Sequence, residues 1–439
     1  MTAKIGIRKE EKNEWERRAP LAPDHVAELV REHDLRIAVQ PSPRRVFSDD
    51  EYAASGATLT DDLSDCGVIL GVKEIPTDDL ERGKTYVYFS HTIKGQPYNM
   101  PMLGRLLDLG ATLIDYERIA DARGRRLIFF GRHAGYAGMI DTLWALGQRL
   151  LWEGMETPFS EIRLAHQYGS LDEANAHVTG VGDMIRRRGL DPSLRPLTFA
   201  FTGSGNVSQG AQEVFGRLPF QEVSPEELPA LRAKGERGAA IVKTVLEKQH
   251  RYARENGGRF DEGEFRANPE RYRGTVGSLL PHITVLVNGI YWDPATPKLV
   301  TRADLRALFA REAKPRLLVL GDITCDIDGS IEATLRSTTP GDPVFVYEPD
   351  SGAALPGVAG KGPVVMAVDN LPCELPLESS EHFGDSLERF VPALARCRWD
   401  VPFRELALPD ELRRAVVVHR GELAPAYEYL RPFVEAAAV

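Results

Sequence analysis

The stretch LTFAFTGSGNVSQGAQEVF, residues 197–215, restricts the fold of this 439-residue chain more than any other. Its apolar, aromatic and β-branched start predicts a buried strand, and its end has apolar residues at helical spacing. Gly203 and Gly205 lie between them, where glycine permits a tight turn and a close approach of backbone N–H groups to a ligand. This order is typical of a dinucleotide site with the pyrophosphate at the start of the helix. A tight turn without a ligand is the competing interpretation, because Ser208 stands where the fingerprint has its third glycine.

The rest of the chain alternates between strand and helix patterns, which is typical of a parallel α/β sheet. Residues 131–154 predict a long helix, the charged segment 224–275 mostly helix and loop, and the tail from about residue 380 helix. The length exceeds one ordinary hydrophobic core, so two α/β domains are expected. Further strands are predicted near residues 4–8, 34–43, 67–76, 85–92, 282–292, 315–326, 343–349 and 363–372.

Composition narrows the class of protein. The formal net charge is −10, which argues against a general nucleic-acid binder. No apolar run reaches membrane-spanning length, and the charged start lacks the apolar segment of a signal peptide. None of the four cysteines has metal-ligand spacing, so we expect no metal site and a reduced, cytoplasmic protein.

Ten residues are candidates for cofactor binding. Glu222 follows the expected second strand at the distance of a ribose-binding acid, Ser224 is an alternative there, and the choice between NADPH and NADH stays open. Asn288 and Asp369 follow later strands, where either of them is expected to contact the nicotinamide ribose or to hold the cleft between the domains. The ten candidates are Gly203, Ser204, Gly205, Asn206, Val207, Ser208, Glu222, Ser224, Asn288 and Asp369.

Ionisable residues also follow the strands of the first half. Lys73 and His91 come after consecutive strands and are expected at one edge of the sheet, where ligands bind in such folds. Singly, each is better explained as an exposed charge or a cap, but together beside a dinucleotide fold they favour acid–base catalysis. Arg18 precedes a helix and is suited to a carboxylate, although, taken alone, a solvated surface arginine explains it better. Glu117 is interpreted either as a partner of the base or of a substrate ammonium, or as a helix cap.

Eight of these segments occur in an order that resembles a known family. They are KEEKNEWERRAPLAP, GVKEIP, FSHTIKGQ, LIDYE, GRHAGYAGMI, FTGSGNVSQGAQ, VNGIYW and DNLPCELPLESSE. In this order they resemble the lysine–ketoglutarate reductase part of the bifunctional aminoadipate-semialdehyde synthases. They are similar, more distantly, to the lysine-forming saccharopine dehydrogenases of fungi and to alanine dehydrogenase. The resemblance extends from about residue 4 to about residue 430.

The resemblance implies a fold and a reaction. The fold is α/β, with two Rossmann-like domains and a cleft between them. Residues 1–136 and 376–439 would form a discontinuous substrate domain, and residues 137–375 the dinucleotide-binding domain. Lysine and 2-oxoglutarate would condense to an imine, which NADPH or NADH would reduce to saccharopine.

The resemblance also implies roles for individual residues. Arg18 matches a substrate-carboxylate arginine, Lys73 and His91 an acid–base pair, and Glu117 a carboxylate that adjusts the charge of that pair. The loop from Gly203 to Gly210 matches the pyrophosphate site, and Asp369 a position in the cofactor cleft. The sequence departs from the relatives at Arg132 and His133, where an uncharged residue and an aromatic one are expected.

Two other functions compete with this one. The first is an amino-acid dehydrogenase of the alanine type, with ammonia as the amine donor, and the second is a catalytically silent nucleotide-binding sensor. The long match through HTIKGQ and DNLPCELP favours the lysine enzyme over the first, and the intact Arg18, Lys73 and His91 speak against the second. A homodimer is compatible with the sequence, which leaves the oligomeric state and the physiological direction open.

Overall fold

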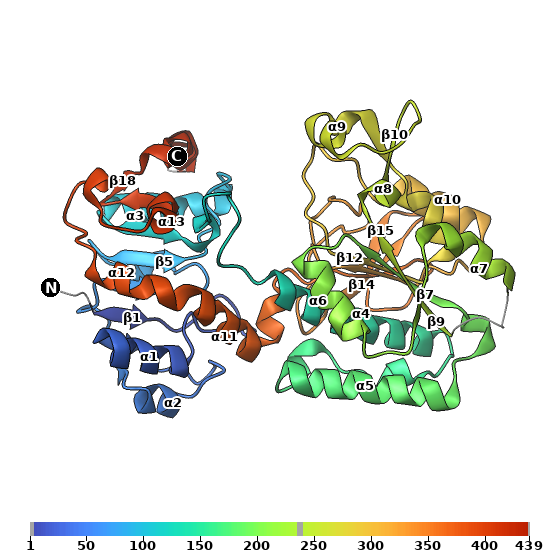
Figure 1. Cartoon of the computed structure of the whole chain (residues 1–439), viewed down its shortest axis with the longest axis horizontal. Helices are drawn as coiled ribbons and strands as arrows, with labels where there is room; N and C mark the ends of the chain where they lie inside the picture. Colours follow the sequence, from blue (N-terminus) through green and yellow to red (C-terminus); the bar gives the residue numbers. More distant parts are fainter. Residues whose placement is uncertain (1–3, 235–239, 438–439) are drawn as a thin grey trace. The chain divides into compact units, whose positions relative to one another are not determined.

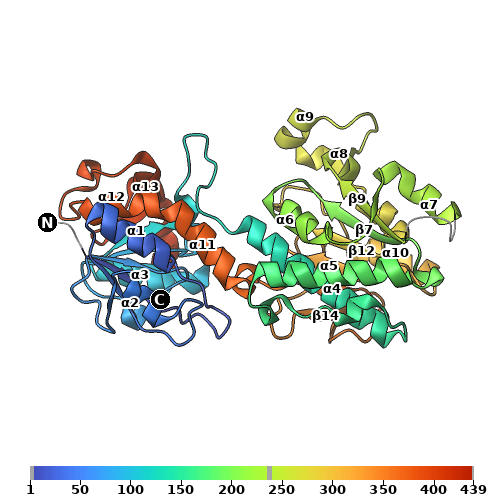
Figure 2. The same cartoon turned by 60° about the horizontal axis from the view of Figure 1, so that its bottom comes forward.

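A computed structural model describes residues 4–234 and 240–437 of the chain (Figure 1, Figure 2). The chain divides into two compact units. Unit 1 comprises Met1–Phe130 and Pro376–Val439, and unit 2 comprises Gly131–Leu375. Blue N-terminal strands and red C-terminal helices therefore belong to the same unit in Figure 1. Each unit contains a large, mainly parallel sheet with helices, so the predicted fold class is confirmed.

Unit 1 is built around an eight-stranded sheet. Its strands from β3 to β6 are parallel, and β17 and β18 continue the sheet in antiparallel orientation. The central strands are short and fully buried, which suits a sheet covered on both faces. In spatial order the strands are β18 (Glu422–Leu423), β17 (Val416–His419), β6 (Thr112–Asp115), β5 (Thr85–Tyr88), β4 (Val68–Leu70), β1 (Ile5–Ile7), β2 (Ile37–Val39) and β3 (Thr58–Leu59).

The helices of unit 1 come from both parts of the chain. The C-terminal tail is predicted to be helical, but it also contains β17 and β18. Three consecutive valines, 416–418, favour a strand, and they are buried against β6. The helices are α1 (Pro23–His33), α2 (Asp49–Ala54), α3 (Met100–Asp108), α11 (Pro376–Leu387), α12 (Val391–Arg396), α13 (Asp410–Ala415) and α14 (Arg431–Ala437).

Unit 2 has a second eight-stranded sheet and a small hairpin. The strands from β8 to β16 are parallel, and β14 and β15 are antiparallel additions at the other edge. The hairpin consists of β10 (Tyr252–Arg254) and β11 (Tyr272–Gly274). In spatial order the strands of the sheet are β15 (Ala353–Pro356), β14 (Val344–Glu348), β16 (Val364–Met366), β13 (Val319–Asp322), β12 (Val285–Asn288), β7 (Leu197–Thr202), β9 (Ile241–Leu246) and β8 (Gln221–Glu222).

Strand β9 lies in the charged segment that is predicted to be mostly helix and loop, and that prediction is wrong for these residues. Ile241–Leu246 reads IVKTVL, a run of β-branched residues that is largely buried between β7 and β8. Lys243 is accommodated at the edge, where its ammonium pairs with Glu222 of β8 at 3.0 Å. Both views show β9 beside β7 (Figure 1, Figure 2).

The long helix α4 (Gly131–Trp152) is confirmed and packs closely against α6 (Asn206–Phe215). A Cβ atom on Gly135 would lie 2.1 Å from the carbonyl oxygen of Val207, and one on Gly210 would lie 2.2 Å from that of Arg132. Gly210 is thus needed for helix packing. The remaining helices of unit 2 are α5 (Leu171–Arg188), α7 (Leu228–Lys234), α8 (Lys248–Arg251), α9 (Glu262–Ala267) and α10 (Arg302–Arg311).

Three findings bear on the composition-based predictions. Cys66, Cys325, Cys373 and Cys397 are free thiols. In the described part of the chain, no three histidine, cysteine or carboxylate side chains are grouped as a metal site requires. Among residues 4–234 and 240–437, no helix has both the length and the apolar character of a membrane span.

Candidate active site

The glycine-rich loop of unit 2 forms the expected strand–turn–helix geometry. Gly203 has a φ of +74°, a conformation that glycine adopts without strain. Gly205 is the residue before the first turn of α6, so no side chain caps the N–H groups at the start of this helix. The Ser208 hydroxyl donates to the carbonyl of Gly203 at 2.7 Å and fixes the turn. Ser208 therefore stabilises the loop from within.

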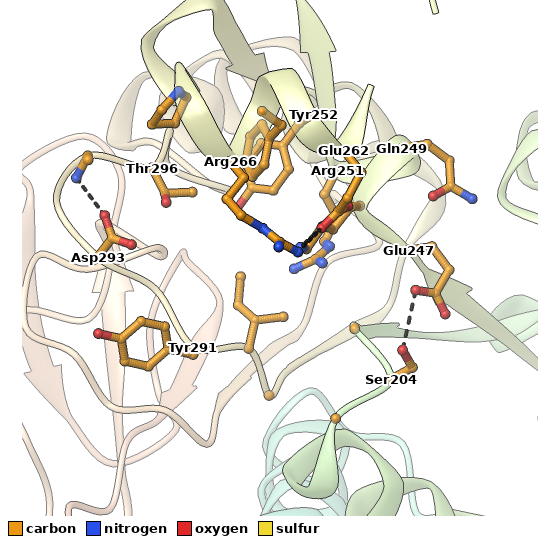
Figure 3. Close-up of a pocket in the computed structure, with 18 residues that line it drawn as sticks. Ser204, Glu247, Gln249, Arg251, Tyr252, Glu262, Arg266, Tyr291, Asp293 and Thr296 are labelled. Carbon is orange, nitrogen blue, oxygen red and sulfur yellow. Dashed lines mark hydrogen bonds and ion pairs between the residues drawn. The ribbon is translucent and has the colours of Figure 1, made fainter. Parts of the chain in front are cut away.

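A pocket of about 760 Å³ opens beside this loop. Its lining comes from the glycine loop, from α8 and α9, and from residues between 289 and 296 after β12 (Figure 3). The pocket thus lies at the carboxyl ends of β7, β9 and β12, where open α/β sheets bind their ligands. Its glycine loop and uncapped helix start fit the pyrophosphate of a dinucleotide.

The acid at the end of the strand next to β7 is Glu247. Glu247 follows β9 and lines the pocket, and its Oε2 accepts a hydrogen bond from Ser204 at 3.4 Å (Figure 3). Glu222 lies instead in the edge strand β8, with its side chain 57% exposed and paired with Lys243. The exposed Ser224 caps a short 3-10 turn after that strand. The structure therefore places Glu247 at the position that the sequence analysis gives to Glu222 or Ser224.

Asn288 and Asp369 have different surroundings. Asn288 is fully buried at the end of β12, where its amide oxygen accepts from Thr202 at 2.7 Å. Its amide nitrogen lies 2.9 Å from Asp322 and 2.9 Å from Ser330. Asn288 thus ties the ends of β7, β12 and β13 together beneath the pocket. Asp369 is exposed after the end of β16.

Arg132 and His133, where the sequence departs from its relatives, lie at the start of α4. Arg132 forms an ion pair with Glu213 of α6, and the Tyr136 hydroxyl donates to the same carboxylate at 2.6 Å. His133 is buried, with its ring 5.5 Å from that of Tyr136. Arg132 and Tyr136 therefore join α4 to α6, while His133 packs within α4.

In unit 1, His91 lies just beyond β5 and is held by Glu74. The distance from His91 Nδ1 to Glu74 Oε1 is 2.6 Å, and Asn99 donates to the same oxygen at 3.3 Å. Burial alone raises the pKa of Glu74, but its hydrogen bond and charge interaction with His91 lower that pKa to about 2. Because an ionised carboxylate can only accept, the proton is on Nδ1, and Nε2 is the nitrogen that can exchange a proton with a ligand.

The backbone at His91 is unusual. Its φ of +49° lies in the left-handed region, which costs a non-glycine residue about 1–3 kcal/mol. The ring stacks on Phe89 with centroids 6.3 Å apart. Strained residues of this kind are concentrated at functional sites, so the geometry agrees with an active role for His91.

Lys73 follows β4 and lies beside a buried acid. Its backbone N–H donates to Glu10 Oε2 at 3.0 Å, and Val72 N–H donates to the other oxygen at 2.6 Å. Burial, followed by the charge of Glu16, raises the pKa of Glu10 to about 7. Lys73 itself is partly buried. Glu10 thus fixes the backbone that presents Lys73.

Arg18 is a buried, paired arginine with 2% exposure. Its Nε and Nη2 donate to the two carboxylate oxygens of Glu16 at 2.7 and 2.6 Å. The guanidinium carbon lies 4.4 Å from the ring centre of Phe130. This clamp excludes the interpretation of Arg18 as an exposed surface residue.

The end of β6 holds a second polar group. Asp115 accepts from the hydroxyl and the N–H of Ser90, and burial raises the pKa of Asp115 to about 6. Its other oxygen accepts from the backbone of Glu117 at 2.7 Å. The Glu117 carboxylate forms an ion pair with Arg126. The carboxylate in contact with His91 is therefore Glu74.

The sequence analysis missed Glu10, Glu16, Glu74 and Glu247 as members of these sites. Glu16 and Glu74 lie within two residues of Arg18 and Lys73, which was a usable signal. Glu247 directly follows the β-branched run of β9, so recognition of that strand would have identified it.

Comparison with known proteins adds to this geometry. The chain is 39% identical over 446 aligned residues to "Alpha-aminoadipic semialdehyde synthase, mitochondrial" of Bos taurus, covering 99% of this chain and 48% of that protein. The chain thus spans about half the length of this relative. It is 26% identical to "Saccharopine dehydrogenase [NAD(+), L-lysine-forming]" of Emericella nidulans, covering 90% of this chain and 92% of that protein. The resemblance predicted from the sequence is confirmed.

The fold comparison agrees. Residues 6–137 match the family model "Alanine dehydrogenase/PNT, N-terminal domain". A solved L-alanine dehydrogenase covers 98% of the chain with a TM-score of 0.61 and 17% identity, which shows a shared fold. The chain therefore has the two-domain, Rossmann-like fold of alanine dehydrogenase.

Proposed function

We propose that this chain is a lysine–2-oxoglutarate reductase. It would join the amine of L-lysine to the keto carbon of 2-oxoglutarate as an imine and reduce the imine to saccharopine with NADPH or NADH, in a reversible reaction. The observation that supports this most is the 39% identity to aminoadipic semialdehyde synthase over 99% of the chain. We also propose that unit 1 binds the substrates and unit 2 the cofactor.

The chemistry requires proton transfers that the residues of unit 1 can perform. Imine formation needs a neutral amine, so a base must take a proton from the ammonium of the substrate lysine. The resulting carbinolamine loses water only when an acid protonates its hydroxyl. His91 Nε2 is suited to exchange these protons, because ionised Glu74 keeps the other ring nitrogen protonated.

Charge complementarity supports the same assignment. The substrates carry carboxylates, which Arg and Lys side chains bind with charge-assisted hydrogen bonds. Arg18 and Lys73 supply such groups, and Glu16 and Glu10 fix their positions. We assign Lys73 to the substrate amine and His91 to the imine carbon, while the opposite order remains open.

A nicotinamide cofactor in the pocket of unit 2 would supply the hydride. Gly203, Gly205 and the start of α6 would hold its pyrophosphate. Glu247 lies where an acid binds the adenosine ribose. The residues present thus fit a dinucleotide.

The test follows absorbance at the nicotinamide band with purified protein, lysine and 2-oxoglutarate, with NADPH and NADH in parallel. Oxidation that requires both substrates is the expected result. Oxidation with ammonia in place of lysine would instead indicate an amino-acid dehydrogenase of the alanine type. Binding of a cofactor without turnover of any amine would indicate the silent sensor. Cytoplasmic location and a homodimer stay predictions.

A further inference from the structure

The side chain of Asn99 contacts the backbone that carries His91 in unit 1. Asn99 is 7% exposed and is the last residue of a 3-10 turn, Pro97–Asn99. Its amide nitrogen donates to the carbonyl oxygen of Ser90 at 2.8 Å. The same nitrogen lies 3.3 Å from Glu74 Oε1 and 3.5 Å from the carbonyl oxygen of His91, so its second N–H is shared between these two acceptors. One amide thus contacts His91, the residue before it and the carboxylate that pairs with it.

The amide of Asn99 is not used for the helix that follows it. Asn99 directly precedes α3, and asparagine is favoured at this position because its side-chain oxygen accepts from N–H groups of the first turn. The side chain of Asn99 makes no such bond, and its nitrogen donates to Ser90 and Glu74 instead. The capping of α3 therefore does not account for an asparagine here, whereas the acceptors around His91 do.

The other side of the same backbone is held by Asp115. The N–H of Ser90 donates to Asp115 Oδ2 at 3.3 Å, and the Ser90 hydroxyl donates to the same oxygen. The Thr92 hydroxyl lies 2.7 Å from that of Ser90. Ser90, Thr92 and Asp115 are completely buried, while the side chain of His91 is 33% exposed. Both neighbours of His91 are thus anchored in the core, and the histidine between them reaches the surface.

His91 needs this support because its backbone is left-handed. A non-glycine residue with a φ of +49° persists in this conformation only when surrounding contacts hold it there. A return to an extended backbone would move the imidazole away from Glu74, which contacts Nδ1 at 2.6 Å. Asn99 contacts the carbonyl groups on both sides of the His91 Cα atom, so its amide opposes that return.

We propose that Asn99 is a positioning residue, which keeps His91 in the left-handed conformation where Nδ1 contacts Glu74 and Nε2 is left to exchange protons with a ligand. The proposal rests on the acid–base role of His91 in the proposed function. It assigns the effect to hydrogen-bond donation, because the amide nitrogen has two N–H groups and is surrounded by three oxygen acceptors. A side chain of the same size without N–H groups would leave these buried acceptors unpaired.

The kinetic test compares two substitutions at this position. Asn99→Ala removes the amide, and Asn99→Asp keeps its size but places an oxygen against the three acceptors. We expect kcat to fall about 10- to 100-fold, with the larger loss in Asn99→Asp, because a small displacement of a catalytic group can cost about 10²-fold. The affinity for NADPH or NADH, measured by titration, should not change, because the nucleotide pocket belongs to unit 2. Leu107→Ala, at a partly buried residue of α3, is the matched control, which should lower the melting temperature and leave kcat unchanged.

A second measurement needs neither substrate nor turnover. Two-bond proton–nitrogen NMR spectra of the full chain, prepared with isotope-labelled histidine, report which ring nitrogen of each neutral histidine carries the proton. The variant His91→Gln identifies the signals of His91 by their loss. The wild type is expected to show a proton on Nδ1, and Asn99→Ala a mixture of both tautomers. Leu107→Ala should keep the wild-type tautomer, because a loss of stability alone does not move the ring.

Other outcomes would overturn the proposal. Wild-type turnover and an unchanged tautomer in Asn99→Ala would show that His91 is held without Asn99. Higher turnover in Asn99→Asp than in Asn99→Ala would show that Asn99 acts through its volume. Asn99→Asp replaces the alanine variant in both measurements if thermal melting shows that variant unfolded. Absence of turnover of lysine and 2-oxoglutarate by the wild type would instead contradict the proposed function, and the tautomer of His91 would still decide the role of Asn99.

Discussion

The two sheets differ in where the second and third strands of each unit lie relative to its first strand. In unit 1 the chain places β2 next to β1 and then β3 at the edge. In unit 2 it goes to the edge first, so that β8 is the outer strand and β9 pairs with β7. The pocket is therefore lined by residues after β9, the third strand in chain order. Spatial position, more than sequence order, determines which strand end contributes to a ligand site.

The two units also differ in how they handle charge. In unit 1 the basic groups have acidic partners within the unit, such as Glu16 for Arg18 and Glu74 for His91. In unit 2 the buried Arg251 of the pocket has no ion pair within the described residues, and the charges of Glu247 and Glu262 act on it from beyond ion-pair distance. Internal pairing suits residues that must hold a defined protonation state through a reaction, whereas a cation without a direct acidic partner suits the binding of an anion. Substitutions of the paired groups in unit 1 should therefore change turnover, and substitutions in the pocket of unit 2 should change nucleotide binding.

The largest effect is expected from His91→Ala. Loss of a general acid–base group lowers kcat by about 10²- to 10⁴-fold. The affinity for NADPH or NADH should not change, because the nucleotide pocket belongs to unit 2. Steady-state kinetics and titration of the same preparation measure both quantities. His33→Ala, at an exposed histidine of α1, is the control. Full turnover by a folded His91→Ala variant would contradict the assignment.

Glu74→Gln should have the next largest effect, a loss of about 10- to 100-fold in kcat/KM. The amide removes the negative charge that fixes the His91 ring, while the size of the side chain stays the same. Since the pKa of Glu74 is about 2, its carboxylate is ionised throughout the assay range. The shape of the pH profile of kcat/KM should change in the variant, which a purely structural role would not cause. Glu28→Gln, exposed on α1, is the control and should leave the pH profile unchanged. An unchanged profile in Glu74→Gln would show that Glu74 has no role in the proton transfers.

The sequence contains enough information for most of the fold. Glycine-rich turns and alternating strand and helix patterns predict the α/β class, the long α4 and the loop at Gly203 and Gly205. They do not predict the order of strands in a sheet, because pairing with β7 depends on contacts far apart in the sequence. The strand β9 was missed because charged residues surround it in the sequence.

The sites could be predicted only in part. Because Lys73 and His91 directly follow predicted strands, they are expected at the same edge of the sheet. The sequence does not give the direction in which their side chains point. Glu117 follows β6 as His91 follows β5, yet its carboxylate pairs with Arg126 because the chain folds back through residues 120–126. The left-handed backbone at His91 leaves only a weak local signal, because histidine is enriched in this conformation but adopts it rarely.

A smaller effect, on stability, is expected from Glu374→Gln in unit 2. Burial raises the pKa of Glu374 to about 8, and burial beside Glu374 raises that of Asp141 well above its usual range. Between pH 4.5 and pH 8 the folded chain therefore keeps a proton that the unfolded chain releases. The free energy of unfolding of the wild type should fall as the pH rises through this interval.

The glutamine carries no titrating proton, so the variant should lose less stability over this interval. The free energy of unfolding of the variant minus that of the wild type should rise by on the order of 2 kcal/mol between pH 5 and pH 8. Denaturant unfolding at these two pH values measures the difference. Glu156→Gln, at an exposed glutamate, is the control. Parallel pH curves for Glu374→Gln and wild type would show that Glu374 does not keep a proton in the folded chain.

The smallest effect is expected from Glu117→Gln, which tests whether Glu74 or Glu117 adjusts the charge of the acid–base pair. Glu117 pairs with Arg126, which is 50% exposed, and such surface ion pairs contribute about 0–1 kcal/mol. The variant should therefore lose less than about 3-fold in kcat/KM, and Arg126→Gln should behave in the same way. Both are measured beside Glu74→Gln under identical conditions. A loss of kcat/KM as large as that of Glu74→Gln would show that Glu117 adjusts the charge of the acid–base pair. It would also mean that the ion pair of Glu117 with Arg126 opens when substrate binds. A small loss would leave Glu74 as the carboxylate that fixes His91, because only a partner in direct contact with the ring holds its Nδ1 proton.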